Sequence, residues 1–140
     1  MDAASHRVEL ARQFAAALDE CDYSRAEGLL ADECRYQRPG RQSLIGPKAI
    51  CDSYRDNDAK AQRDFDSVHY RSDAAVNETG GIRLTFFDEL RRGSATHIFR
   101  CSQIVYFDED QKISRIELVE FPGERERLNE FCATVGIRLK

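Results

Sequence analysis

The chain has 140 residues, 33% charged and 41% hydrophobic, a composition typical of a single globular domain spanning residues 1–140. Its formal net charge of −4 argues against nucleic acid or an anionic membrane surface as a partner. The five cysteines form no CxxC pair, so we expect reduced thiols in a cytoplasmic protein rather than a disulfide framework or a zinc knuckle. We also expect no signal peptide and no membrane helix, because the N-terminus has no apolar core and no apolar run is long enough to span a bilayer.

The first half of the sequence predicts three helices and two short strands. Apolar residues at spacings of three and four predict a helix over 5–20, and Asp22 caps a second helix over 23–30. Short strands over 34–37 and 43–45 flank the turn at Pro39-Gly40. A third helix opens at Gly46-Pro47 and is expected to fray over 56–64, where the sequence is polar.

The second half changes to strand periodicity. Four strands are predicted over 65–77, 82–90, 95–107 and 112–121, followed by a closing helix over 124–135. Apolar residues occupy both phases of the last two strands, which predicts a sheet covered on both faces, one by helices and the other by a partner or loops. An apolar face left exposed would aggregate, so we expect a homodimer through it.

This order of elements predicts an α+β fold, in which a curved antiparallel sheet wraps three N-terminal helices as a cone and an extra C-terminal helix follows. The open end of such a cone is a concavity of the kind that binds small ligands. Asp88 and Glu89 stand near Arg91 and Arg92, and we interpret this charged group as a mixed, solvated surface.

Three sequence patches carry a resemblance to a known family. They are residues 14–22 (FAAALDECD), residues 29–40 (LLADECRYQRPG) followed by GPKAI at 46–50, and residues 104–113 (IVYFDEDQKI). In order and spacing they resemble the SnoaL-like, polyketide cyclase-like branch of the nuclear-transport-factor-2-like superfamily. The similarity covers most of residues 8–121.

The resemblance implies a small, mostly apolar molecule bound in the cone, with acid–base chemistry of the lyase, isomerase or cyclase type. The alternative is a non-catalytic ligand-binding or dimerisation module, because the superfamily contains both and a fold does not fix a function. Steroid-type isomerisation is disfavoured. Arg38 stands where those isomerases carry the aspartate base before the proline, and Phe14 stands at the position of their oxyanion-hole tyrosine.

Three residues on the last strands are candidate catalytic groups. SnoaL-like cyclases use an acid/base residue that projects into the cone from the later strands, for which Glu117, Glu120 and His97 are available. Glu117 and Glu120 are three residues apart, so in a strand they point to opposite faces and only one can enter the cone. His97 is either a base tuned near neutral pH or a strand-end histidine with an ordinary hydrogen bond.

Four further residues are candidates for substrate binding: Tyr36, Arg38, Tyr54 and His69. The resemblance places Tyr36 at the cone mouth. Arg38 is suited to a carboxylate or enolate oxygen, or it pairs with Glu33 or Asp32 on the surface. His69 could face His97 across the sheet, but a metal site would need a third ligand such as Glu117, so we predict no metal. There is no glycine-rich phosphate loop, and we predict no cofactor.

Overall fold

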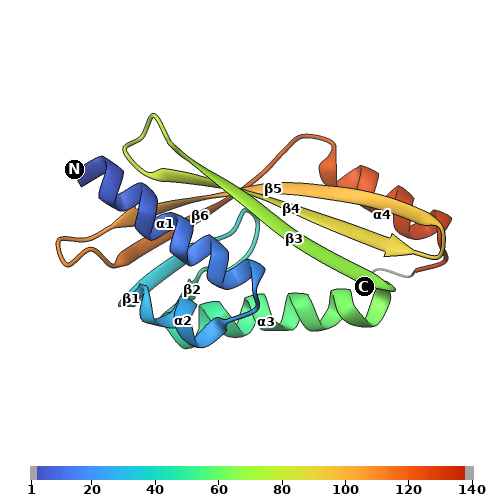
Figure 1. The fold of residues 1–140 in the computed structure, drawn as a ribbon, viewed down its shortest axis with the longest axis horizontal. Helices are drawn as coiled ribbons and strands as arrows, with labels where there is room; N and C mark the ends of the chain where they lie inside the picture. Colours follow the sequence, from blue (N-terminus) through green and yellow to red (C-terminus); the bar gives the residue numbers. More distant parts are fainter. Residues whose placement is uncertain (1–2, 138–140) are drawn as a thin grey trace.

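The computed structural model of this chain describes residues 3–137 (Figure 1). Its elements in chain order are α1 (Ala3–Asp19), α2 (Tyr23–Gly28), β1 (Leu30–Gln37), β2 (Leu44–Ile45), α3 (Pro47–Asp64), β3 (Ser67–Val76), β4 (Ile82–Arg92), β5 (Ala95–Phe107), β6 (Ile113–Glu120) and α4 (Glu124–Thr134). The strands form one six-stranded sheet in the order β2-β1-β6-β5-β4-β3.

The sheet is built from an antiparallel meander to which β1 adds in parallel. Strands β3 to β6 pair in sequence order, whereas β1 runs parallel to β6 with Leu30 opposite Ile113. The predicted α+β cone fold, with a fourth helix after the sheet, is therefore confirmed, and the parallel edge makes the sheet mixed. None of the helices in the described range is long and apolar enough to cross a membrane.

One face of the sheet holds the main core. Alternation along the strands turns Leu84 of β4, Val105 of β5 and Ile116 of β6 toward the helices, and all three side chains are fully buried. Phe14 of α1 and Ile50 of α3 are equally buried in the same cluster. We call this the inner face, and the opposite one the outer face.

Two sequence-based boundaries were wrong. The first strand begins at Leu30 rather than at residue 34, because the second helix ends early at Gly28 and the chain then pairs with β6. The third helix does not fray over 56–64 but continues to Asp64. Polar contacts hold this end in place: Tyr70 Oη donates to Asp58 at 2.7 Å, and Arg92 Nη1 donates to the Asp64 carbonyl at 2.5 Å.

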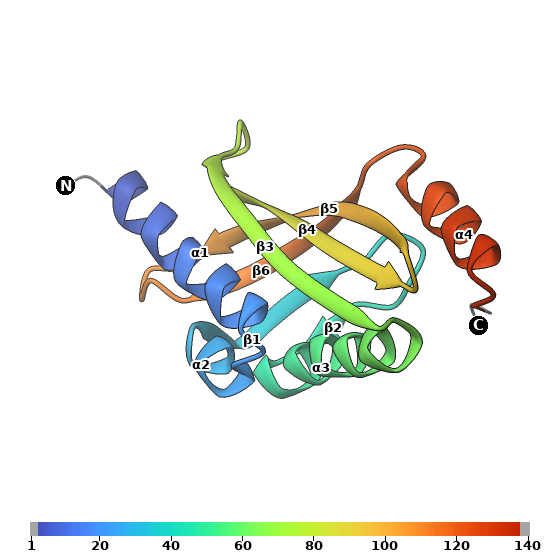
Figure 2. The ribbon, with the colours of Figure 1, turned by 45° about the vertical axis from the view of Figure 1, so that its right-hand side comes forward.

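The last helix, α4, lies at the far end of the β4–β5 hairpin (Figure 2). Its residues Leu128 and Cys132 are buried against Leu90 and Phe99 of that hairpin, in a second, smaller core. The helix therefore extends the inner-face layer beyond the three N-terminal helices.

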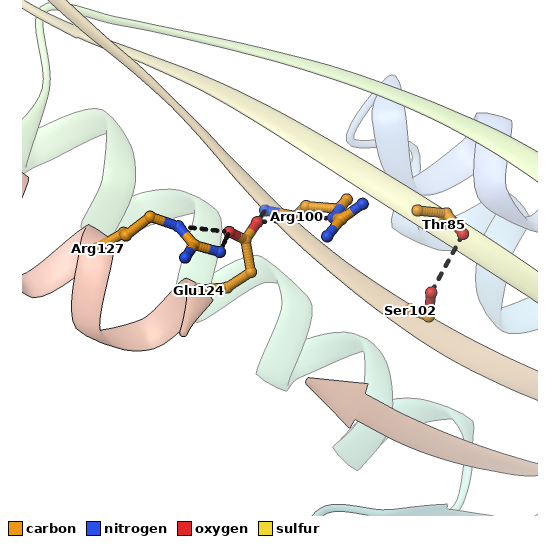
Figure 3. A network of polar contacts seen from close by, with 5 residues as sticks. All are labelled: Thr85, Arg100, Ser102, Glu124 and Arg127. Carbon is orange, nitrogen blue, oxygen red and sulfur yellow. Dashed lines mark hydrogen bonds and ion pairs between the residues drawn. The ribbon is translucent and has the colours of Figure 1, made fainter. Parts of the chain in front are cut away.

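Glu124 fastens α4 to the sheet. Its buried carboxylate lies between Arg127 and Arg100 (Figure 3), and the hydrogen bond from Arg127 holds the pKa of Glu124 below its ordinary value. The backbone N–H of Arg100 donates to Glu124 Oε1 at 3.0 Å. β6 ends opposite Cys101, so the N–H of Arg100, the preceding residue of β5, has no partner in that strand. The Glu124 carboxylate accepts this hydrogen bond in its place.

We expect Glu124→Gln to lower the free energy of unfolding by about 1–3 kcal/mol, because it removes the charge that satisfies two arginines and a strand-edge N–H. Chemical denaturation followed by circular dichroism measures this. Glu126→Gln is the matched control, since Glu126 is exposed on the same helix, and it should stay within about 0.5 kcal/mol of the parent chain. Equal effects of the two substitutions would refute the anchoring role.

Candidate functional site

A cavity of about 540 Å³ opens between the inner face of the sheet, α3 and α4. Its size lies within the range of small-molecule sites. The apolar part of its wall comes mainly from Leu18, Phe86, Leu90, Phe99, Leu118 and Leu128. Carboxylates, arginines and tyrosines make up much of the remainder, so the wall is mixed rather than uniformly apolar.

Asp88 projects into this cavity from the middle of β4. It occupies the same strand phase as Phe86 and Leu90, and it lies opposite Tyr70 of β3 and Phe99 of β5. Burial raises the pKa of Asp88 to about 7, and the negative charge of Asp19 contributes further. No described side chain donates a hydrogen bond to this carboxyl group or pairs with it.

Two other carboxylates line the same end of the cavity, and each has a donor. Asp58 accepts from Tyr70 Oη at 2.7 Å, and Asp19 accepts from Ser72 Oγ at 2.6 Å. Burial raises the pKa of Asp19 as well, against the opposing effect of the Ser72 hydrogen bond. Asp88 therefore differs from Asp19 and Asp58 in having no hydrogen-bond partner among the described residues, which leaves its partly buried carboxyl group free for a ligand.

A chain of tyrosine hydrogen bonds crosses the cavity wall. Tyr54 Oη donates to Gln103 Oε1 at 2.7 Å, and Gln103 Nε2 donates to Tyr36 Oη at 3.4 Å. Burial raises the pKa of both tyrosines above the ordinary value, so they stay protonated. The two tyrosines predicted to bind substrate thus line the cavity and are linked to each other.

The two candidate glutamates lie on opposite faces of the sheet, as the alternation of side chains along a strand requires. Glu120 lines the cavity at the end of β6, where Arg125 Nη2 donates to it at 2.8 Å. Glu117 lies on the outer face opposite Ile104 and is paired with Arg115. Of the two, only Glu120 has access to the cavity.

The two candidate histidines lie outside the cavity lining and are not neighbours. His97 stacks on Phe131 of α4 with ring centroids 5.2 Å apart, and burial lowers its pKa. His69 is exposed on the outer face. It pairs with Glu89 of β4, which in turn pairs with Ile98 of β5 and not with His97. The idea that the histidines face each other is therefore wrong, because successive residues of β5 alternate between faces. Among residues 3–137 no group of three or more His, Cys, Asp or Glu is placed to hold a metal ion.

Arg38 lines the cavity just beyond the end of β1. Its Nη2 donates to the Gln42 carbonyl at 2.8 Å, and its guanidinium lies 5.8 Å from the centre of the Tyr36 ring. It pairs with neither Glu33 nor Asp32 in the described structure.

Sequence reasoning missed Asp88, which was assigned to a solvated surface because arginines follow it. A signal was present. Ile82, Leu84, Phe86 and Leu90 place an apolar residue at every second position of β4, and Asp88 interrupts that series in phase. A lone carboxylate within the buried phase of a strand indicates a group facing the core or a cavity.

Comparison with solved structures identifies the fold that surrounds this cavity. The chain has a nuclear-transport-factor-2-like fold, and solved structures with this fold match along most of its length. Bal32a, from a soil-derived mobile gene cassette, matches with a TM-score of 0.67 at 15% identity, covering 84% of this chain and 90% of its own.

Two further structures give the same result. SalBIII, described as an epoxide hydrolase/cyclase-like enzyme in pyran ring formation in the polyether salinomycin, has a TM-score of 0.67 at 11% identity over 89% of this chain and 97% of its own. A candidate polyketide cyclase of Xanthomonas campestris pv. campestris has a TM-score of 0.64 at 14% identity over 95% and 99%. No family model matches the sequence, and no curated protein matches it.

We expect Asp88→Asn to stabilise the fold at about pH 8 by roughly 2–4 kcal/mol and to have little effect near pH 3.5. The folded chain holds this proton up to a pKa of about 7, whereas the unfolded chain releases it near its ordinary value. Stability is therefore lost as the pH rises between these two values, and asparagine avoids that loss.

Urea unfolding across this pH range measures the effect. Glu89→Gln is the control, because the adjacent residue on β4 is exposed on the outer face. A pH-independent difference between Asp88→Asn and the parent chain would contradict the raised pKa.

Proposed function

We propose that this chain is an acid–base catalyst of the isomerase, lyase or cyclase type, acting on a small molecule bound in the cavity. The observation that carries the proposal is Asp88, a partly buried and unpartnered carboxyl group with a pKa of about 7 that faces a cavity of ligand size. An acid or base works best when its pKa lies near the operating pH, and Asp88 meets that condition.

In the proposed reaction Asp88 removes a proton from a carbon next to a carbonyl group and returns it elsewhere on the product. Near neutral pH about half of the Asp88 population is ionised and able to accept that proton. Glu120 also lines the cavity, but its carboxylate already accepts a hydrogen bond from Arg125 Nη2 at 2.8 Å, so it is not free to take a proton from a ligand. We therefore assign proton transfer to Asp88.

The test follows proton exchange in an apolar bicyclic ketone, 2-tetralone, by NMR in deuterated buffer. We expect the chain to accelerate exchange at the carbons beside the carbonyl, with a rate that rises with pH around a midpoint near 7, because the ionised carboxylate is the base. Asp88→Asn should lower this rate about 100-fold or more.

Glu89→Gln should retain the parent rate. An Asp88→Asn rate equal to that of the parent chain would remove Asp88 from the reaction. No acceleration at all, with ketone binding intact, would favour the alternative, a non-catalytic ligand-binding module.

We also propose that two copies associate through the outer face of the sheet. This face carries Phe87 of β4, Val119 of β6 and Ile98 of β5, whose side chain is 46% exposed. The described helices pack on the inner face, so no helix of residues 3–137 covers this surface. Charges of both signs lie on this face, including Glu117 and Arg100. Such a mixture suits a two-fold symmetric interface, in which the same surface patch of each copy contacts the other.

Light scattering after size exclusion should give the mass of a dimer at micromolar concentration for the parent chain and a monomer for Ile98→Asp. An aspartate there buries a charge in the proposed interface without touching the core. Val76→Asp is the control, since Val76 is 63% exposed at the end of β3 and in the inner-face phase. A monomeric parent chain would end the dimer proposal.

A cytoplasmic location is consistent with the thiols. All five cysteines are free, and three of them (Cys34, Cys51 and Cys132) are buried. Free buried cysteines suit a reducing compartment, and we assign the chain to the cytoplasm on that basis.

A further inference from the structure

The charges in the cavity wall are divided between its two ends. Asp19, Asp58 and Asp88 lie at the end formed by α1, α3 and β4. At the other end, Arg38 and Arg41 follow β1. Arg125, from the start of α4, is paired with Glu120 and lies over Phe99, the residue opposite Asp88 on β5. Lys60 and Asp64 of α3 add one charge of each sign. The end next to β1 thus carries two arginines, Arg38 and Arg41, and we call it the arginine end.

Two arginines at this end have unused hydrogen-bond donors. Arg38 Nε is buried and has no hydrogen-bond partner among the described residues. Arg41 is exposed, and its side chain makes no hydrogen bond or ion pair within residues 3–137. A buried donor without an acceptor costs about 1–3 kcal/mol, which a bound acceptor would remove.

The Tyr36 hydroxyl supplies a third donor at the same place. Tyr54 donates to the Gln103 carbonyl oxygen, and the Gln103 amide then donates to Tyr36, so the Tyr36 oxygen already accepts a hydrogen bond. Its own proton has no acceptor in the described structure. The Arg38 guanidinium lies 5.8 Å from the centre of the Tyr36 ring, and Tyr36, Arg38 and Arg41 all line the cavity.

We propose that the cavity takes an apolar ligand that carries a carboxylate, and that this carboxylate binds to Arg38, Arg41 and the Tyr36 hydroxyl. Three donors without acceptors, two of them cationic, suit an oxyanion. The planar fork of an arginine matches a carboxylate particularly well. The inference names the substrate class of the proposed function and rests on it for the use of the cavity as a ligand site.

The geometry sets the carboxylate apart from the reacting carbon. β1 and β4 are separated by β6 and β5, so Tyr36 and Asp88 are three strand spacings apart across the sheet, roughly 14 Å at about 4.8 Å each. Tyr36 aligns through Ile116 and Val105 with Ile82, so the two residues are also offset along the strands by the distance from Ile82 to Asp88, roughly 20 Å at about 3.3 Å per residue. Cys101 of β5 lies between the two ends of the cavity, and burial raises the pKa of its thiol to about 12, so it stays neutral. A ligand that reaches both ends is therefore longer than a single ring and crosses a neutral middle section.

The experiment compares binding of 2-naphthoate and 2-naphthamide, and of 4-biphenylcarboxylate and its amide, by calorimetry at about pH 7.5. Each pair has nearly the same shape and differs in charge. We expect the parent chain to bind at least one acid about 10-fold more tightly than its amide. Arg38→Gln and Arg41→Gln should each reduce that preference, and the double variant should abolish it while leaving amide affinity unchanged.

Misfolding would not explain a loss of the acid preference in Arg41→Gln, because Arg41 is exposed and makes no polar contact in the described structure. Arg91→Gln is the matched control, since Arg91 is exposed and does not line the cavity. The proposal is overturned if no acid binds more tightly than its amide, or if the preference survives in the double variant. Binding is measured without turnover, so a preference for acids alongside absent proton exchange would reject the catalytic proposal alone.

Discussion

The pairing of β5 with both β4 and β6 determines what the cavity contains. Because side chains alternate along each strand, this register sends Asp88, Cys101 and Glu120 to the inner face and Glu117 to the outer face. A shift of either pairing by one residue would exchange the two sets. The buried residues around this ladder, such as Val105 and Ile116, oppose such a shift, since it would bring core side chains into water.

The cavity combines two requirements that oppose each other. A carboxyl group with a pKa near neutrality needs an environment with little water, whereas recognition of a charged group needs free donors. The structure separates them along the sheet, with Asp88 at one end and Arg38 at the other. If the arginines stood beside Asp88, their charges would stabilise its ionised form and lower its pKa.

The periodicity of apolar residues and the positions of turn-forming residues predicted most of the fold, whereas the site was predicted only in part. The switch from helical to strand spacing after residue 65 placed the meander, and Gly80-Gly81 and Arg92-Gly93 placed its turns. The parallel pairing of β1 with β6 was not predicted, because short polar strands carry no local sign of their partner. Tyr36 and Arg38 were found through resemblance. Asp88 was missed because charge counting along the chain gave more weight to the neighbouring arginines than to the phase of the strand.

The parallel edge of the sheet also has a consequence for how the chain acquires its structure. Leu30 pairs with Ile113, more than eighty positions later, and Lys112 Nζ donates to the Gly28 carbonyl at 2.6 Å. Contacts between such distant segments form slowly, since a long loop must close first. The meander and its hairpins are local and can assemble alone. On a ribosome the N-terminal third would emerge first, yet β1 can pair only with the two-residue strand β2 until β6 has been synthesised.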